Sequence, residues 1–411
     1  MKNNMTTGSD IKGTSNKRLV PELRFPEFKQ NGEWEEKRLG DLCKIGNGKD
    51  YKHLNKGCIP VYGSGGYMTS VDDFLYDGDS VCIGRKGTID RPIFLTGKFW
   101  TVDTLFYTHS FCCCLPRFLY WIFQQIDWYR YNEAGGVPSL SKKTIENIKY
   151  SFPSPAEQQK IAEYLSSIDE EINAIKEKVE QLKAHKKGLI QKLFPVAGKF
   201  APELRFPEFE KDEEWEGMTL GEVFERVSEK NVNNNQNVLT ISAQYGLVSQ
   251  YDYFNKNVAA ANIKSYYFIH KGDFAYNKSR SQGYPFGVIK PLRRYDSGVV
   301  STLYICFRAK TNCYIDFYEQ YFDTDLINNE ISKIAQEGAR NHGLLNISID
   351  DFFNKIKILV PHSSEQEKIA ECLSSIDELI SLYENKVTLL EQHKKGLMQQ
   401  LFPKPTKLLI N

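Results

Sequence analysis

Two stretches of the chain place apolar residues at alternating steps of four and three. They lie within residues 153–195 and 361–403, and each ends at a proline, Pro195 or Pro403. A mean step of 3.5 residues keeps apolar side chains on one face of a supercoiled helix. Each stretch therefore predicts a long helix with a coiled-coil seam. The predicted seam positions are Ile161, Leu165, Ile168, Ile172, Ile175, Val179, Leu182, Ile369, Leu373, Ile376, Ile380, Tyr383, Val387 and Leu390.

Both stripes are interrupted at a matching lysine, Lys186 in the first and Lys394 in the second. Ser154 and Ser364 are the expected N-caps, because each is followed by a glutamate three positions on. Two such stripes in one chain most simply bury each other. We expect an antiparallel pair, in which the end of the first helix lies beside the next segment of the chain. The alternative is two amphipathic helices that pack separately on their own domains.

Repeated phrases divide the chain. "PELRFPEF" occupies residues 21–28 and returns unchanged at 202–209, while "EQQKIAEYLSSIDE" from Glu157 returns as "EQEKIAECLSSIDE" from Glu365. The order of short motif, variable segment and long helix therefore occurs twice, which indicates an internal repeat. We expect the short motif to be a clasp, where the end of one helix meets the other half of the repeat.

The variable segments, residues 40–152 and 219–360, alternate short β-branched or aromatic runs with glycine turns. "GDSVCIGRKG" (78–87) corresponds to "GDFAYNKSRSQG" (272–283), and "DTLFYT" (103–108) to "STLYIC" (301–306). The predicted fold class is α/β (α+β): two α/β domains held apart by two long helices that form an antiparallel coiled coil, with a pseudo-twofold internal repeat. The predicted boundaries are 1–19 for a disordered tail, 20–152 for the first variable domain, 153–195 for the first helix, 196–218 for a linker with the repeated motif, 219–360 for the second variable domain, 361–403 for the second helix and 404–411 for a C-terminal tail.

Composition excludes several classes of protein. The first 19 residues are polar and lack the apolar core of a signal peptide. The longest apolar run, Phe118 to Phe123, is too short to cross a bilayer. We therefore expect a cytoplasmic protein. The nine cysteines form no C-x-x-C motif, and we expect reduced, buried thiols rather than a metal site.

Catalytic signatures are missing from the sequence. There is no G-x-x-x-x-G-K-[ST] phosphate loop, no H-E-x-x-H, no G-x-S-x-G and no Asn-Pro-Pro-aromatic stretch. We predict no catalytic residue and no metal. An enzyme with an unrecognised site is the alternative.

Binding chemistry is more apparent. The net charge of +1 conceals a local excess of positive charge. Between Lys264 and Lys310 the sequence contains nine Lys or Arg residues but only two Asp, together with several tyrosines. Basic residues among aromatics and turn glycines are typical of surfaces that follow DNA phosphates and reach base edges. Ordinary solvated hairpins are the alternative. The candidate DNA-binding residues are Arg85, Lys86, Arg91, Gln244, Tyr245, Asn277, Lys278, Ser279, Arg280, Gln282, Arg293, Arg294, Arg340 and Asn341.

The doubled "PELRFPEF…W…LG" and the doubled "EQ[QE]KIAE[YC]LSSIDE…HKKGL…LFP" resemble the specificity subunit of type I restriction–modification enzymes. The resemblance covers nearly the whole chain, although the variable segments match only in outline. It implies that each variable domain is a target-recognition domain that reads one half of a bipartite site in double-stranded DNA. It also implies that this subunit is not catalytic and carries no cofactor. S-adenosylmethionine would belong to two modification (methyltransferase) subunits, and ATP with Mg to two restriction (translocase/endonuclease) subunits.

The resemblance also implies that the helices set the half-site spacing and dock the modification subunits. A helix of about 33 residues is roughly 50 Å long, which corresponds to about 15 bp of B-DNA. A coiled-coil scaffold that presents two protein-binding domains is the alternative function.

Overall fold

The computed structural model describes residues 19–242, 245–254, 263–281, 283–310, 313–337 and 343–403. The chain forms two compact units: unit 1 contains Met1–Ile175 and Asn385–Asn411, and unit 2 contains Lys176–Glu384. The limits of the units fall inside the long helices. Each unit therefore holds one variable domain with the start of one long helix and the end of the other.

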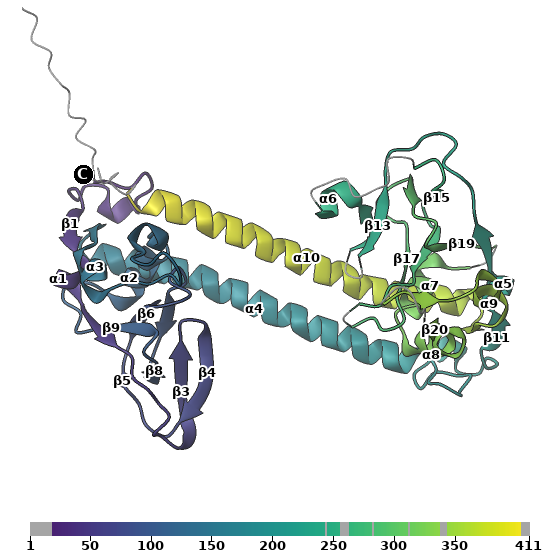
Figure 1. Ribbon diagram of the computed structural model, residues 1–411, viewed down its shortest axis with the longest axis horizontal. Helices are drawn as coiled ribbons and strands as arrows, with labels where there is room; N and C mark the ends of the chain where they lie inside the picture. Colours follow the sequence, from purple (N-terminus) through teal and green to yellow (C-terminus); the bar gives the residue numbers. More distant parts are fainter. Residues whose placement is uncertain are drawn as a thin grey trace, which may run out of the picture. The chain divides into compact units, whose positions relative to one another are not determined.

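The variable domain of unit 1 is built on two four-stranded sheets (Figure 1). The first has the order β2 (Lys44–Asn47), β9 (Leu105–His109), β6 (Ser80–Gly84) and β7 (Ile93–Leu95), with every neighbouring pair antiparallel. The second has the order β4 (Gly66–Val71), β3 (Lys56–Gly63), β8 (Lys98–Thr101) and β5 (Tyr76–Asp77), in which β3 and β8 are parallel. The remaining elements are η1 (Pro26–Phe28), β1 (Glu35–Arg38), α1 (Leu39–Leu42), α2 (Pro116–Phe123), η2 (Trp128–Tyr131), α3 (Lys142–Asn147) and β10 (Lys149–Phe152), with β1 paired to β10.

Unit 2 repeats this plan. Its four-stranded sheet has the order β12 (Phe224–Val227), β19 (Ile305–Ala309), β16 (Phe274–Asn277) and β17 (Val288–Pro291). The pairs β13 (Leu239–Ser242) with β14 (Gly246–Ser249), and β15 (Tyr267–His270) with β18 (Ser297–Val300), are joined by a parallel bridge between Val238 and Val299. The order β14-β13-β18-β15 thus matches β4-β3-β8-β5. The other elements are η3 (Pro207–Phe209), β11 (Glu216–Thr219), α5 (Leu220–Val223), α6 (Gln250–Phe254), α7 (Ile315–Tyr321), α8 (Asp325–Ile334), β20 (Gln336–Glu337), β21 (Leu345–Asn346), α9 (Ile349–Asn354) and β22 (Lys357–Val360).

The repeat predicted from the sequence is therefore confirmed at the level of individual strands. The predicted correspondences place β6 opposite β16 and β9 opposite β19, which are the two central strands of each four-stranded sheet. Helices cover one face of these central strands and the second sheet covers the other, so their residues are mostly apolar. All five residues of β6, for example, are buried. Since the pairing is almost entirely antiparallel among the described strands, α+β is the more accurate of the two class labels.

The long helices are α4 (Pro155–Leu193) and α10 (Ser363–Leu401), each of 39 residues. Their direction follows from pairing inside each unit. In unit 1, Lys394 bonds Asp169 and Lys386 bonds Glu171, so the residue number falls along α10 as it rises along α4. The predicted antiparallel pair is confirmed. The structure buries Ile161, Leu165, Ile168, Ile172, Ile175, Val179, Ile369, Leu373 and Ile376, and it half-buries Leu182, Ile380, Tyr383, Val387 and Leu390.

The lysines that interrupt the two stripes have matching partners. Lys186 Nζ lies 2.7 Å from both carboxylate oxygens of Asp377, within unit 2. Lys394 Nζ bonds Oδ1 of Asp169 within unit 1. The lysine that interrupts each stripe therefore forms a charged pair with the opposite helix. Because an apolar partner at the lysine position would leave the aspartate unpaired, these pairs favour one register over its neighbours.

The repeated "PELRFPEF" motif caps the end of a long helix. In unit 1 the Leu23 amide donates to the Gln400 carbonyl (2.9 Å), and in unit 2 the Leu204 amide donates to the Lys192 carbonyl (2.9 Å). Carbonyls in the last turn of a helix have no partner within the helix, so the motif supplies one. Two aromatic pairs complete the contact, Trp34 with Phe402 (6.0 Å between centroids) and Trp215 with Phe194 (6.1 Å).

The same motif also grips the start of the other helix. Arg24 donates to Glu157 from Nε and Nη2, both at 2.7 Å, and Arg205 donates to Glu365 from Nε and Nη2, also at 2.7 Å. Both glutamates are buried. The glutamate that opens each long-helix phrase is therefore the anchor of the clasp.

Two sequence expectations are wrong in detail. Ser154 caps α4, where the Glu157 amide donates to its hydroxyl, but Ser364 lies inside α10, whose first turn bonds the His362 carbonyl. The cause is a shift in the alignment, since His362 is the true counterpart of Ser154. The cysteines are also not all buried: Cys58, Cys112 and Cys113 are exposed, while all nine are free thiols.

Within the described ranges, no helix combines the length and the apolar character that a membrane span requires.

Candidate nucleic-acid interface

The loop after β6 presents two of the predicted basic residues on a fixed backbone. The Arg85 amide donates to the Thr104 carbonyl (2.8 Å), and the Leu140 amide donates back to the Arg85 carbonyl (2.9 Å). On the far side of Lys86, the Gly87 amide donates to the Pro138 carbonyl (2.9 Å). The turn can be this tight because Gly84 lacks a Cβ, which would lie 1.9 Å from the Thr88 carbonyl oxygen. The exposed Arg85 and Lys86 side chains thus project from a rigid base.

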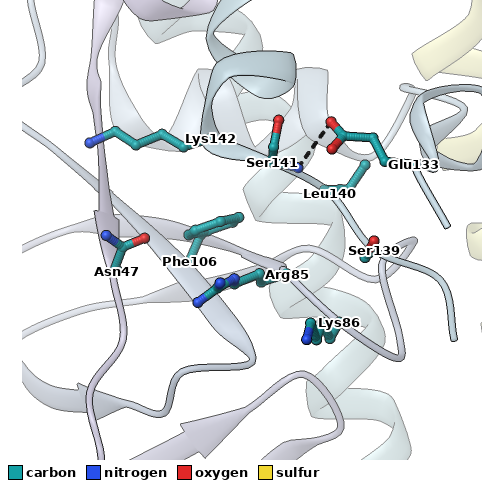
Figure 2. A pocket seen from close by; sticks show the side chains of 9 residues that line it. All are labelled: Asn47, Arg85, Lys86, Phe106, Glu133, Ser139, Leu140, Ser141 and Lys142. Atoms are coloured by element: carbon teal, nitrogen blue, oxygen red, sulfur yellow. Dashed lines mark hydrogen bonds between the residues drawn. The ribbon is translucent and has the colours of Figure 1, made fainter.

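These side chains line an open pocket of about 470 Å³ (Figure 2). Asn47, at the end of β2, contributes an amide, and Lys142, at the start of α3, contributes a third amine. In Figure 2, Asn47, Arg85 and Lys142 surround the ring of Phe106, and the Arg85 guanidinium carbon lies 6.0 Å from the centre of that ring. Cations and an amide around an aromatic floor suit a phosphate or the polar edge of a base.

Glu133 is the carboxylate that lines this pocket, and its oxygens already accept hydrogen bonds from the protein. It accepts hydrogen bonds from the Thr144 hydroxyl and from the Ser141 amide (3.3 Å), the second of which is drawn in Figure 2. These bonds lower the pKa of Glu133, so the side chain stays ionised and ties its loop to the first turn of α3. Glu133 is exposed, but both bonds hold its carboxylate at the first turn of α3, whereas no such bond is drawn to Arg85, Lys86 or Lys142 in this pocket.

Unit 2 contains a loop with the same backbone bonding. The Leu345 amide donates to the Lys278 carbonyl (3.0 Å), and the Arg280 amide donates to the Gly343 carbonyl (2.7 Å). Ser279 forms a bridge with Leu344, as Lys86 does with Ser139 in unit 1. The three residues Lys278, Ser279 and Arg280 therefore stand where unit 1 has Arg85, Lys86 and Gly87.

Lys278 is unusual within this loop. Its side chain is half-buried, and burial lowers the pKa of its amine. Within the described part of unit 2, no carboxylate or carbonyl accepts a hydrogen bond from that amine. A partly desolvated cation without a partner gains stability from an anion or a base acceptor. Asn277, directly before it, uses its Oδ1 to accept the Ser279 amide (3.0 Å).

The other candidates are more dispersed. Arg91 is exposed just before β7, and Arg294 is exposed with its guanidinium carbon 6.0 Å from the ring of the exposed Tyr245. Arg293 forms ion pairs with Asp316 and Glu319 (3.0 Å) instead of standing free. Four candidates, Gln244, Gln282, Arg340 and Asn341, lie outside the described residues.

The positive bias counted between Lys264 and Lys310 overstates the free charge. Lys290 is buried against Asp323 (2.6 Å), Arg308 pairs with Asp273 (2.6 Å), and the Lys310 amine donates to the Gly221 carbonyl (2.6 Å). The carboxylates of Asp316, Glu319 and Asp323 come from α7 and the residues just after it, beyond the counted stretch. A count along the sequence cannot include carboxylates that folding brings in from elsewhere.

Several residues of the candidate interface were not predicted from the sequence. Asn47, Phe106 and Lys142 come from three separate segments, and their types alone are unremarkable. The start of β4 also exposes Tyr67 (63%) and Met68 (51%), which line a pocket that includes Thr104. A signal was present there, since two large apolar residues directly follow the glycine-rich "GSGG".

No group of three or more His, Cys, Asp or Glu side chains that could hold a metal ion occurs among the residues that the structure describes.

Comparison with known proteins adds the family. The type I restriction modification DNA specificity domain matches residues 31–184 and again residues 212–392. The chain is 30% identical over 297 residues to the type I restriction enzyme MjaVIII specificity subunit of Methanocaldococcus jannaschii, an alignment that covers 65% of this chain and 64% of the relative. It is 26% identical over 154 residues to the type I restriction enzyme EcoDI specificity subunit of Escherichia coli, covering 36% and 34%. The chain thus spans less than two thirds of the length of these relatives.

A solved structure supports the fold. The S subunit of a type I restriction-modification system from M. genitalium superimposes with a TM-score of 0.64 at 16% sequence identity, over 94% of this chain and 100% of that one. The two matched domains, the doubled sheets and the paired helices agree with the resemblance carried by the repeated motifs. The chain belongs to the type I restriction modification DNA specificity family, and it contains the family's domain twice.

Proposed function

We propose that this chain is the DNA-recognition subunit of a type I restriction–modification complex, and that each recognition domain reads one half of a bipartite site in double-stranded DNA. One observation carries the proposal: the loops 85–87 and 278–280 share a backbone hydrogen-bonding pattern and differ in their side chains. A conserved frame with exchanged side chains is the arrangement that two readers of two different half-sites require.

The chemistry of the loops suits DNA. Arginine or lysine can bond the O6 and N7 atoms of guanine in the major groove, and either can bond a phosphate. In unit 1, Arg85 and Lys86 are adjacent and Lys142 lies across the same pocket. In unit 2, Lys278 and Arg280 are separated by Ser279, so the spacing of the cations differs. The two half-sites should therefore differ in sequence.

The reactions of the complex belong to partner subunits in this proposal. Two modification subunits supply S-adenosylmethionine-dependent methylation, and two restriction subunits supply ATP- and Mg-dependent translocation and cleavage. This chain supplies no catalytic group and binds no cofactor, and the complex acts in the cytoplasm. The paired helices dock the modification subunits; exposed leucines on α10 support this, since Leu382 and Leu389 are both 65% exposed. Burial of apolar side chains of that size by a partner is energetically favourable.

The test is selection of targets from a random DNA library by the chain in complex with its modification subunits. Arg85→Ala should relax the preference at one half-site, and Lys278→Ala should relax it at the other. A lost base contact costs about 1–3 kcal/mol, which is roughly 5- to 150-fold in affinity for the affected half.

Matched controls are Arg38→Ala and Lys333→Ala, which remove exposed cations away from the loops. These variants should keep the target of the unaltered chain. If the unaltered complex selects no sequence, the chain is a scaffold for proteins and the proposal fails. If Arg85→Ala and Lys278→Ala weaken all DNA equally, the loops contact phosphates and other residues read the bases.

A further inference from the structure

The turn between β9 and α2 holds two neighbouring thiols. Cys112 and Cys113 are both exposed, and their sulfur atoms lie 3.8 Å apart. All nine cysteines of the chain fall within the described residues, and all are free. This pair plays no part in the DNA-reading loops, so it calls for a separate explanation.

The backbone of the turn is held from two sides. The Cys112 amide donates to the Leu42 carbonyl of α1 (2.8 Å), and the Cys113 carbonyl accepts from Gln158 Nε2 of α4 (3.1 Å). Gln158 Oε1 in turn accepts the Leu115 amide (3.0 Å). Cys113 has a φ of 55°, in the left-handed region. The turn therefore fixes both Cα atoms while the two thiols remain accessible to solvent.

The geometry disfavours a disulfide. Neighbouring Cα atoms across a trans peptide are about 3.8 Å apart, whereas disulfides usually join Cα atoms about 4.4–6.8 Å apart. A sulfur separation of 3.8 Å suits another product. Two sulfurs bound at about 2.3 Å to one soft centre, at an angle of about 100–110°, are themselves about 3.5–3.8 Å apart.

The number of ligands restricts the class of that centre. A structural zinc ion needs four ligands, and no group of three or more His, Cys, Asp or Glu side chains that could bind a metal exists in the described part of the chain. A trivalent organoarsenical needs only two sulfurs, because its third bond is to carbon. The two sulfur atoms therefore supply all the protein ligands that an organoarsenical needs, but only half of those that a structural zinc ion needs.

We propose that Cys112 and Cys113 form a chelating dithiol site for one trivalent organoarsenical. The reaction is a condensation without oxidation or reduction. An arsenic–oxygen double bond and two S–H bonds break, two As–S bonds form, and the oxygen leaves with both thiol protons as water. The hydrogen bond with Cys113 raises the pKa of Cys112, which favours the thiol form of Cys112 that this balance requires.

The site is a property of unit 1 alone. In unit 2 the corresponding glutamine, Gln366, makes the same kind of bonds, to the Tyr314 amide (3.1 Å) and the Pro361 carbonyl (3.0 Å). The cysteine that precedes Tyr314 is the half-buried Cys313. The chelating site therefore lies where the first recognition domain joins α4. The inference does not depend on the proposed DNA recognition.

The test uses the reduced full-length chain and phenylarsine oxide. Intact-mass spectrometry should show one phenylarsenic group per chain, which survives an excess of 2-mercaptoethanol but is removed by dithiothreitol. Binding to the folded chain should also raise the melting temperature, because the ligand favours the folded state. Cys112→Ser and Cys113→Ser should each lose the adduct and the thermal shift, while Cys58→Ser, which alters an exposed cysteine on β3, should keep both.

Circular dichroism and the unliganded melting temperature establish that the serine variants fold. An adduct of equal resistance to 2-mercaptoethanol in either Cys112→Ser or Cys113→Ser would overturn the proposal, because other thiols would then be the ligands. Failure of the unaltered chain to form the adduct would also overturn it.

Discussion

The clasp at the start of α4 makes a strong prediction about stability. Glu157 is 1% exposed and receives two bonds of 2.7 Å from Arg24, whose side chain is 7% exposed, and a third of 3.3 Å from Trp34 Nε1. Glu157→Ala leaves the guanidinium buried without its counter-charge. Loss of one member of a buried ion pair costs about 3–5 kcal/mol. The opening equilibrium of unit 1 should therefore rise by roughly 200- to 5,000-fold.

The second repeat supplies a matched comparison. Glu365 is also 1% exposed and bonds Arg205 in the same way, but Trp215 Nε1 has no hydrogen-bond partner among the described residues of unit 2. Glu365→Ala loses one hydrogen bond fewer. Its effect on unit 2 should be smaller than the effect of Glu157→Ala on unit 1 by about 0.5–1.5 kcal/mol, the usual net contribution of such a bond.

Native-state hydrogen exchange read by mass spectrometry is the appropriate assay, because the two units need not unfold together. In Glu157→Ala, protection should fall in residues 157–175 and remain in residues 365–376; Glu365→Ala should show the opposite pattern. The double variant Arg24→Met/Glu157→Met, which removes both charges, should recover much of the loss. A loss below about 1 kcal/mol in Glu157→Ala would refute the reasoning, as would no recovery in a double variant that folds.

Three further predictions test the repeat, the spacing and the half-buried Lys278. Joining Val20 to Pro403 and reopening the chain between Pro195 and Ala201 should preserve DNA specificity, because Leu23 already bonds Gln400; a folded permutant that selects a new target would contradict this. One heptad added after both Val179 and Val387 lengthens each helix by about 10 Å, or roughly 3 bp, so library selection should give the same half-sites with the spacer longer by about 1–3 bp; an unchanged spacing in a DNA-binding variant would show that the helices do not measure it. Because burial lowers the pKa of Lys278, affinity for the half-site of unit 2 should fall as the pH rises toward 10.5, the ordinary value, and Lys278→Arg should remove that dependence. In the same pH range the unfolded chain binds more protons than the folded chain, so the stability of free unit 2 should rise with pH in chemical denaturation; a flat profile in both assays would mean that Lys278 is solvated.

The helices and the repeat could be predicted because their signals are local or duplicated. Heptad spacing states which face of a helix is buried, and a phrase copied twice shows where each repeat begins. The lysines at positions 186 and 394 had no explanation in the sequence, since their partners Asp377 and Asp169 belong to the other helix. Only the antiparallel pairing brings them together.

The candidate interface could be predicted in part. Arg85 and Lys278 follow matching strands, so their equivalence was visible. Asn47 and Lys142 join Arg85 through pairings that are distant in the sequence. Conversely, Arg293 and Arg308 were counted as available, and folding neutralises both. Reduced, buried thiols were expected in place of a metal site, but Cys112 and Cys113 occupy a solvent-facing turn that α1 and α4 hold in place.

The central claim is that one chain reads two half-sites for a methylating complex. Genome sequencing that detects N6-methyladenine, applied to host cells with and without the gene for this chain, tests it most directly. The account predicts one bipartite motif, with methyladenine in each half and an unread spacer of fixed length, that disappears when the gene is deleted. A continuous motif, or a bipartite motif that persists after deletion, would contradict it.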